Sequence, residues 1–348
     1  MTLEVDGLTH RYGSELAVDD ESFSVDDGEL VALVGPSGCG KTTIVQAIAG
    51  HITPTAGTIS LRGQAVTTQP PEARGVGVVF QEPTLYPHLT GAENVAYGLK
   101  AQGMGAAERE KRVDSCLSLV DLSASHDAMP GELSGGQRRR VELARALAPE
   151  PDILLLDEPL SALDRALRRQ LQDEISRIQA ETGVTTLFVT HDQREAMSLA
   201  DRLVVIQDGR IAAVGEPRAL YHSPPTRFVG SFLGRSNMLA ATVVDRASSL
   251  ISVGGTEITA PTLPEADQLV VQLRPEAVTV GSADQSSADE ITFSGRVVDV
   301  ADLGTQYDVE IELSTGERLV GTVHRSPPAV DETVSVEVDQ RDIVVFER

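Results

Sequence analysis

The sequence predicts an α/β domain followed by a small all-β barrel, and a change of residue pattern along the chain leads to this fold class. From residue 1 to about 235, apolar runs typical of buried strands alternate with stretches of helical periodicity. From 236 to 348, short segments of alternating polarity are separated by polar or Gly/Pro breaks. We therefore expect two domains, 1–235 and 236–348.

Each domain has its own set of expected elements. The α/β domain should have strands at 3–5, 30–34, 57–61, 76–80, 153–157, 185–189 and 203–206. Residues from about 82 to 135 have helical periodicity instead, most clearly at 106–120, and predict an inserted helical subdomain. The barrel strands are expected at 269–273, 293–300, 307–313, 318–323 and 333–338, with a Ser/Asp-rich loop at 282–289.

The octapeptide at residues 35–42, Gly-Pro-Ser-Gly-Cys-Gly-Lys-Thr, fits the phosphate-binding pattern G-x-x-x-x-G-K-[ST]. It follows the predicted strand 30–34 and precedes a predicted helix. Its glycines let the backbone curl so that amide groups point at phosphate oxygens, and the helix N-terminus adds partial positive charge. Lys41 would reach the outer phosphates and the Thr42 hydroxyl would bind Mg²⁺. The pattern predicts a P-loop site for a nucleoside triphosphate.

A second apolar strand ends in two carboxylates, Asp157 and Glu158. Mg²⁺ prefers a few oxygen ligands and retains water, so we expect Asp157 to hold it through its water shell. Glu158 is placed to polarise a water molecule in line with the γ-phosphate. Alone, Asp-Glu-Pro would be a solvated exit from a strand. After a phosphate-binding loop, the catalytic interpretation is favoured.

Taken in order, these motifs resemble the ATP-binding subunit of an ABC importer, over essentially the whole chain. The resemblance implies an ABC cassette with a helical subdomain, ATP and Mg²⁺ as ligands, and a catalytic set of Glu158, His191 and Gln81. Gln81 would also lie near the metal and link the site to a membrane subunit. The nucleotide contacts that it implies are Tyr12 on the adenine, then Gly35, Ser37, Gly38, Cys39, Gly40, Lys41, Thr42, Thr43, Ser134, Gly135, Gly136, Gln137 and Asp164.

The signature pentapeptide, residues 133–137, begins a predicted helix that runs to about residue 148. Its N-terminal amides form an anion site. In the family these amides close over the ATP of a second copy, which implies a head-to-tail homodimer that opens after hydrolysis. The adjacent arginines 138–140 could be mistaken for a nucleic-acid patch. The net charge of −23 favours a polar helix face instead, with Arg139 a neutral departure from the signature.

Two surfaces and one motif indicate partners. The segment 81–89 should form a groove for a coupling helix of the membrane subunit, with Leu85, Tyr86 and Leu89 either exposed for docking or buried within the cassette. The motif Leu-Arg-Pro-Glu at 273–276 matches an OB-type (TOBE) regulatory domain found in one importer subfamily. That subfamily serves sugars, polyamines, iron(III), sulfate-type anions and thiamine. Local resemblance at 228–239 favours iron(III), polyamine or thiamine over sugars.

Composition constrains the location of the chain. No apolar run of about 20 residues is present, and residues 1–9 lack a signal pattern, so we expect a peripheral protein on the cytoplasmic face of the membrane. The two cysteines, Cys39 and Cys116, argue against a disulfide or metal site. The chain has three lysines among 29 basic residues, an acidic, lysine-poor balance that resembles proteins of haloarchaea; arginine-rich codon usage is the alternative.

The sequence therefore predicts an ATPase that converts ATP and water to ADP and phosphate to drive solute uptake. It would work as a homodimer with two transmembrane permease subunits and, indirectly, an extracytoplasmic solute-binding protein, without nucleic acid. One alternative is the same role in a sugar importer, and another is an ABC ATPase of DNA repair or translation. Such ATPases carry two cassettes or a long coiled coil. A sensor that does not hydrolyse ATP is a third, which intact Glu158 and His191 disfavour.

Overall fold

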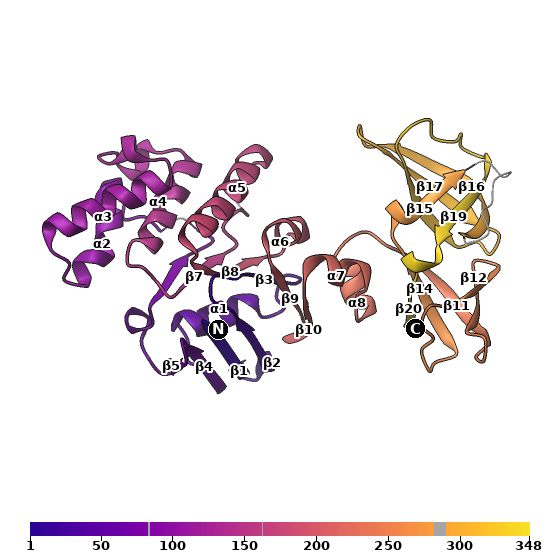
Figure 1. Ribbon diagram of the computed structural model, residues 1–348, viewed down its shortest axis with the longest axis horizontal. Coiled ribbons are helices and arrows are strands. Elements are labelled where there is room, and N and C mark those ends of the chain that lie inside the picture. Colours follow the sequence, from indigo (N-terminus) through magenta and orange to yellow (C-terminus); the bar gives the residue numbers. More distant parts are fainter. Residues whose placement is uncertain (83, 162, 282–289) are drawn as a thin grey trace. The chain divides into compact units, whose positions relative to one another are not determined.

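The computed structural model describes residues 1–82, 84–161, 163–281 and 290–348. The chain forms two compact units, Met1–Arg218 and Ala219–Arg348 (Figure 1). The domain boundary expected after residue 235 stays a prediction. The Ser/Asp-rich loop expected at 282–289 lies outside the described residues.

A six-stranded sheet forms the centre of the first unit, in the order β10-β9-β3-β8-β7-β6. Apart from the antiparallel edge strand β10, neighbouring strands are parallel. Every residue of β3, β7 and β8 is buried, as expected for parallel strands covered on both faces. The bounds are β3 Leu30–Val34, β6 Val76–Val79, β7 Ile153–Asp157, β8 Thr185–Thr190, β9 Arg202–Gln207 and β10 Arg210–Gly215. The carboxyl ends of parallel strands meet at one edge, and binding residues gather there.

An antiparallel sheet of order β2-β1-β4-β5 completes this core. Its strands are β1 Leu3–Tyr12, β2 Glu15–Val25, β4 Ala56–Leu61 and β5 Gln64–Ala65. One apolar cluster joins this sheet, helix α1 (Lys41–Ala49) and the central sheet. The sequence did not predict β2, because its acidic, half-exposed residues lack a continuous apolar run.

The inserted helical segment consists of α2 (Gly91–Ala101), α3 (Ala106–Leu119) and α4 (Gly135–Leu147), which pack together (Figure 1). Threonine or serine side chains cap α2 and α4 by accepting hydrogen bonds from the N3 amides. Helices α5 (Arg165–Thr182) and α6 (Gln193–Leu199) flank β8 in sequence and begin at aspartate caps. The short helices α7 (Pro217–His222) and α8 (Arg227–Phe232) follow.

The second unit contains two five-stranded antiparallel sheets around one apolar core. The first sheet has β11 Asn237–Asp245, β12 Leu250–Val253, β13 Thr256–Thr259, β14 Gln268–Leu273 and β20 Val344–Glu347. The second has β15 Val278–Gly281, β16 Glu290–Asp302, β17 Tyr307–Leu313, β18 Arg318–Val323 and β19 Thr333–Asp339. The all-β prediction is confirmed. The sequence missed the β12–β13 hairpin, whose turn is Gly254-Gly255 with positive φ at both residues.

Candidate nucleotide-binding and hydrolysis site

The loop between β3 and α1 requires glycine at two positions. A Cβ on Gly35 would lie 2.3 Å from the carbonyl oxygen of Ile206, and one on Gly40 would lie 2.5 Å from that of Ala17. Gly40, which is the N-cap of α1, also has a φ of 106°. The loop therefore closes tightly against its neighbours, and this curvature brings amide groups to the N-terminus of α1.

Lys41 lies inside this curve. Its ammonium group donates to the carbonyl oxygens of Gly35 and Pro36, both at 2.8 Å, and contacts the Cys39 sulfur at 3.7 Å. Both residues are buried, with Lys41 6% exposed and Cys39 4% exposed. A cation is thus held at the position where the sequence pattern predicts phosphate contacts.

A pocket of about 600 Å³ opens beside the loop. Tyr12, at the end of β1, lies on its wall; its ring is half-exposed and packs edge-on against His10 with 4.6 Å between centroids. The wall also includes Ser37, Gly38, Gly40, Lys41, Thr42, Thr43 and Glu158, all expected from the sequence. Glu15, Asp208 and Gly209 line it as well, and no motif pointed to them.

Asp157 is the last residue of β7 and is buried. Burial raises the pKa of its carboxyl, and the neighbouring Glu158 charge raises it further, while Lys41 and Arg139 lower it. A desolvated carboxylate beside a second carboxylate suits a bound cation. Among the described residues, no group of three or more His, Cys, Asp or Glu side chains could hold a metal ion. One carboxylate with the Thr42 hydroxyl fits Mg²⁺, which retains water and takes its other ligands from phosphates.

The three residues of the expected catalytic set lie together. One oxygen of the Glu158 carboxylate accepts a hydrogen bond from the Gln81 amide at 3.2 Å and lies 3.1 Å from the His191 Nδ1. Glu158 follows β7, His191 follows β8, and Gln81 comes two residues after β6, so the shared edge of the sheet brings them together. Glu158 also has a φ of 43°, and its amide donates to the Val189 carbonyl at 2.9 Å.

The signature residues lie elsewhere in the unit. Among the described residues that line the nucleotide pocket there is none of Ser134, Gly135, Gly136 or Gln137. Ser134 and Gln137 form a capping box on α4, with bonds of 3.2 and 2.9 Å. Asp164 caps α5, with its carboxylate accepting from two backbone amides at 3.0 Å. Ala162, in the same loop, lies outside the described residues.

The expectation of a polar helix face at 138–140 is wrong for Arg139, which is buried. Its side chain is 6% exposed, and it forms an ion pair of 2.9 Å with Glu142, whose side chain is 1% exposed. Position 139 shares a helix face with Gly136, Leu143 and Ala146, so the helical period could have revealed its burial.

A separate groove of about 410 Å³ is lined by Phe80, Thr84, Tyr86, Tyr97, Gly98 and Arg145. Tyr86 packs against Tyr97, with centroids 4.6 Å apart, and lies under the Arg145 guanidinium at 5.7 Å. Leu85 and Leu89, also expected in this region, are partly buried and do not belong to its described lining. Pro83 lies outside the described residues.

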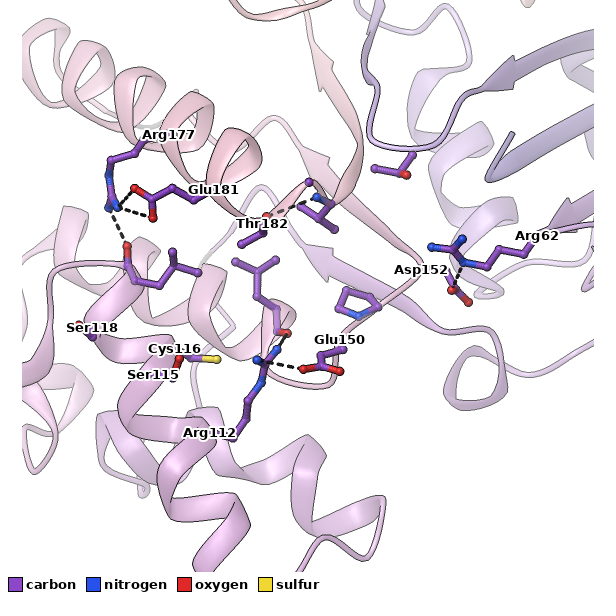
Figure 2. Close-up of a pocket in the computed structure, with 16 residues that line it drawn as sticks. Arg62, Arg112, Ser115, Cys116, Ser118, Glu150, Asp152, Arg177, Glu181 and Thr182 are labelled. Carbon is purple, nitrogen blue, oxygen red and sulfur yellow. Dashed lines mark hydrogen bonds and ion pairs between the residues drawn. The ribbon is translucent and has the colours of Figure 1, made fainter.

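A larger cleft, of about 790 Å³, opens between α3, the end of α5 and the chain around residue 150 (Figure 2). Three arginines line it, and each pairs with a carboxylate of its wall: Arg62 with Asp152, Arg112 with Glu150, and Arg177 with Glu181. Charge in this cleft is therefore balanced locally, and we assign it no ligand. None of the helices in the described part of the chain is both long and apolar enough to cross a membrane.

Comparisons with known proteins show which family the chain belongs to. The family described as ABC transporter matches residues 18–161, and the TOBE domain family matches 271–346. The Fe(3+) ions import ATP-binding protein FbpC of Rhizobium etli is 41% identical over 332 residues, 94% of this chain and 93% of that protein. The spermidine/putrescine import ATP-binding protein PotA of Nitrosomonas europaea is 40% identical over 332 residues, 94% of this chain and 92% of that protein. A dimeric, post-hydrolysis structure of the ATP-binding cassette MJ0796 bound to ADP and Pi has a TM-score of 0.56 and 31% identity, over 62% of this chain and 99% of the other.

Proposed function

This chain belongs to the import ATP-binding proteins of ABC transporters, and on that premise we propose the roles of its residues, its partners and its cargo. It is the ATP-hydrolysing subunit of an ABC importer. The observation that carries the proposed mechanism is the Glu158 carboxylate, held between Gln81 and His191 at the wall of the P-loop pocket.

In this mechanism the protein positions charge around a phosphoryl group. Lys41 and the loop amides bind the outer phosphates, while Thr42 and Asp157, with Gln81 close by, would hold Mg²⁺. When bound, Mg²⁺ supplies positive charge that offsets the charge developing on the phosphates. Glu158 accepts a hydrogen bond from the attacking water and orients it. His191 contacts the γ-phosphate, and Tyr12 stacks on adenine.

The homodimer is the second proposal. Ser134 and Gly135 are exposed at the N-terminus of α4, away from the pocket of their own chain. A helix N-terminus is a ready anion site, so a second copy can place its γ-phosphate there. The structure of the similar cassette MJ0796 is dimeric. This arrangement makes dimer closure depend on ATP and lets hydrolysis release it.

Partners and location follow from the importer role. The aromatic groove around Tyr86 and Tyr97 is the proposed binding site for a coupling helix of a permease subunit, one on each copy of the chain. Binding to two permease subunits would keep the protein on the cytoplasmic face of the membrane. An extracytoplasmic solute-binding protein delivers the cargo to the permeases. For the cargo we propose iron(III) or a polyamine, the solutes named for the two relatives, with thiamine and sugars as alternatives.

The β unit has a TOBE-type fold, and we propose that it regulates the transporter. The residues of the motif at 273–276 make structural contacts within this unit. Arg274 is buried, lies 3.9 Å above the Tyr221 ring and donates to the Tyr221 carbonyl at 2.9 Å. The Tyr221 hydroxyl donates to Glu276, and burial together with this contact raises the Tyr221 pKa to about 12.

The acidic, lysine-poor composition supports a further proposal, that the protein comes from a haloarchaeon and works in concentrated salt.

Glu158→Gln tests the hydrolytic role. The amide keeps the shape of the side chain but cannot orient water in the same way, so turnover should fall about 10²-fold or more while ATP binding and dimerisation persist. Steady-state phosphate release and size-exclusion chromatography with ATP measure the two effects. Turnover of Glu158→Gln at the wild-type rate would remove Glu158 from this role.

The same variant tests the partners. ATP-locked Glu158→Gln should recover multi-spanning subunits and their binding protein from detergent-solubilised membranes of its host in high KCl. Recovery of soluble proteins alone, or of none with the dimer intact, would instead favour a non-transport ATPase.

A further inference from the structure

The buried Arg139 on α4 contacts the backbone on both sides of the catalytic hydrogen bond. Its Nε donates to the Pro159 carbonyl at 2.9 Å, one residue beyond Glu158. Its two terminal nitrogens donate to the carbonyls of Phe80 and of Gln81, the latter at 3.1 Å. The Gln81 amide in turn donates to the Glu158 carboxylate at 3.2 Å. One rigid guanidinium therefore joins the loop that carries the donor, Gln81, to the loop that carries the acceptor, Glu158.

Glu142, on the next turn of α4, adds two further contacts to this hydrogen-bond network. One of its oxygens pairs with Arg139 at 2.9 Å, and the other accepts from the Thr84 amide. Arg145, one turn further, donates to the Thr84 carbonyl at 2.8 Å and to its hydroxyl at 2.6 Å. The segment after Gln81 is thus fastened to the signature helix, beside the groove that Thr84 and Arg145 line.

We propose that Arg139, held by Glu142, is a positioning residue for ATP hydrolysis that sets the distance between Gln81 and Glu158. This inference rests on the proposed hydrolytic function. The planar guanidinium of arginine presents several donors in a fixed geometry, whereas an ammonium group on a flexible stem acts as a point charge. Backbone displacements near 1 Å at a catalytic group are enough to change rates severely. Arg139 touches no substrate and acts only through the two loops.

Arg139→Lys separates positioning from simple ion pairing. Lysine keeps a charge opposite Glu142 but cannot donate to the carbonyls of Pro159 and Gln81 together. We expect kcat to fall about tenfold with the KM for MgATP within about twofold of wild type. In a Gln81→Ala background the same substitution should cost much less, because the hydrogen bond it acts through is already lost.

Arg140→Gln is the matched control. Arg140 lies on the same helix and forms a comparable ion pair of 2.7 Å with Glu174 on α5, away from both loops. It should lower the melting temperature while kcat stays within about twofold of wild type. Arg139→Gln combined with Glu142→Gln should regain the stability lost in Arg139→Gln alone, without regaining kcat, because no buried carboxylate is left unpaired.

These outcomes distinguish a failure of the proposed hydrolytic function from a failure of the positioning role of Arg139. If the wild-type protein hydrolyses no MgATP, the proposed function itself fails. If the wild type is active and Arg139→Lys keeps its kcat, or loses rate equally with and without Gln81, only the positioning role is overturned.

Discussion

At the scale of single residues, the site concentrates features that cost stability. Glu158 has left-handed backbone geometry at a φ of 43°, which is unfavourable for a residue with a side chain. The hydrogen bond that its backbone amide donates to the Val189 carbonyl holds it in that conformation between two strand ends. Asp157 beside it is a buried carboxylate with a raised pKa. Neither feature stabilises the fold, which agrees with the proposed roles of the two residues in ATP hydrolysis.

Asp157→Asn should therefore stabilise the nucleotide-free protein while abolishing turnover. Because the folded pKa of Asp157 is raised, ionising it near pH 7 costs folding free energy, and that cost disappears as the pH falls below the folded pKa. We expect this substitution to raise the melting temperature by roughly 2–4 °C at pH 7, and the gain to shrink as the pH is lowered through the folded pKa of Asp157. Calorimetry from pH 7 down through the acidic range measures this. A lower melting temperature at pH 7, or a gain that grows on acidification, would show that the burial of Asp157 carries no such cost.

At the scale of elements, the signature helix α4 shows one segment with two tasks. Ser134 caps the helix through Gln137, while the same N-terminus is the proposed γ-phosphate site of a partner copy. Helix α2 begins with an equivalent capping box at Thr90, which bonds the Glu93 amide at 3.2 Å. The two helices therefore allow capping to be separated from nucleotide contact.

Ser134→Ala and Thr90→Ala should each cost about 1 kcal/mol of unfolding free energy, because each removes one side-chain cap. Only Ser134→Ala should also abolish ATP-driven dimerisation and lower turnover. Urea unfolding gives the first quantity, and size-exclusion chromatography with ATP in the Glu158→Gln background gives the second. Equal effects of both variants on the dimer would exclude a role for Ser134 beyond capping.

The elements that the sequence predicted best have strong local signals. Apolar runs located β3 and β7, three apolar residues among threonines located β8, and turn glycines with a lysine located the phosphate loop. The edge strand β2 is half-exposed and was missed, because only its pairing with β1 makes it a strand. The sequence also could not predict contacts between segments that lie far apart in the chain. Arg139 meets Phe80 and Pro159 across 59 and 20 residues, and no local pattern encodes those distances.

At the scale of the whole molecule, the net charge of −23 is the dominant property. Like charges repel over about 30 Å at 0.01 M salt and over about 3 Å at 1 M. Repulsion among surface carboxylates destabilises a compact chain, and salt removes that repulsion. Ion pairs would lose strength in salt, but the exposed ones contribute little to stability. We therefore expect the protein to be most stable in concentrated salt.

We expect the melting temperature to rise by at least about 5 °C between 0.1 M and 2 M KCl, because screening removes more repulsion than attraction in so acidic a chain. Calorimetry across a KCl series measures the shift. Changing Glu4, Glu108 and Glu110 to Gln provides the control, since these three described side chains are exposed on the surface of the cassette. This triple variant should be more stable than wild type at 0.1 M and indistinguishable from it at 2 M. A melting temperature that stays flat or falls with KCl would favour codon usage over salt adaptation as the origin of the lysine-poor composition.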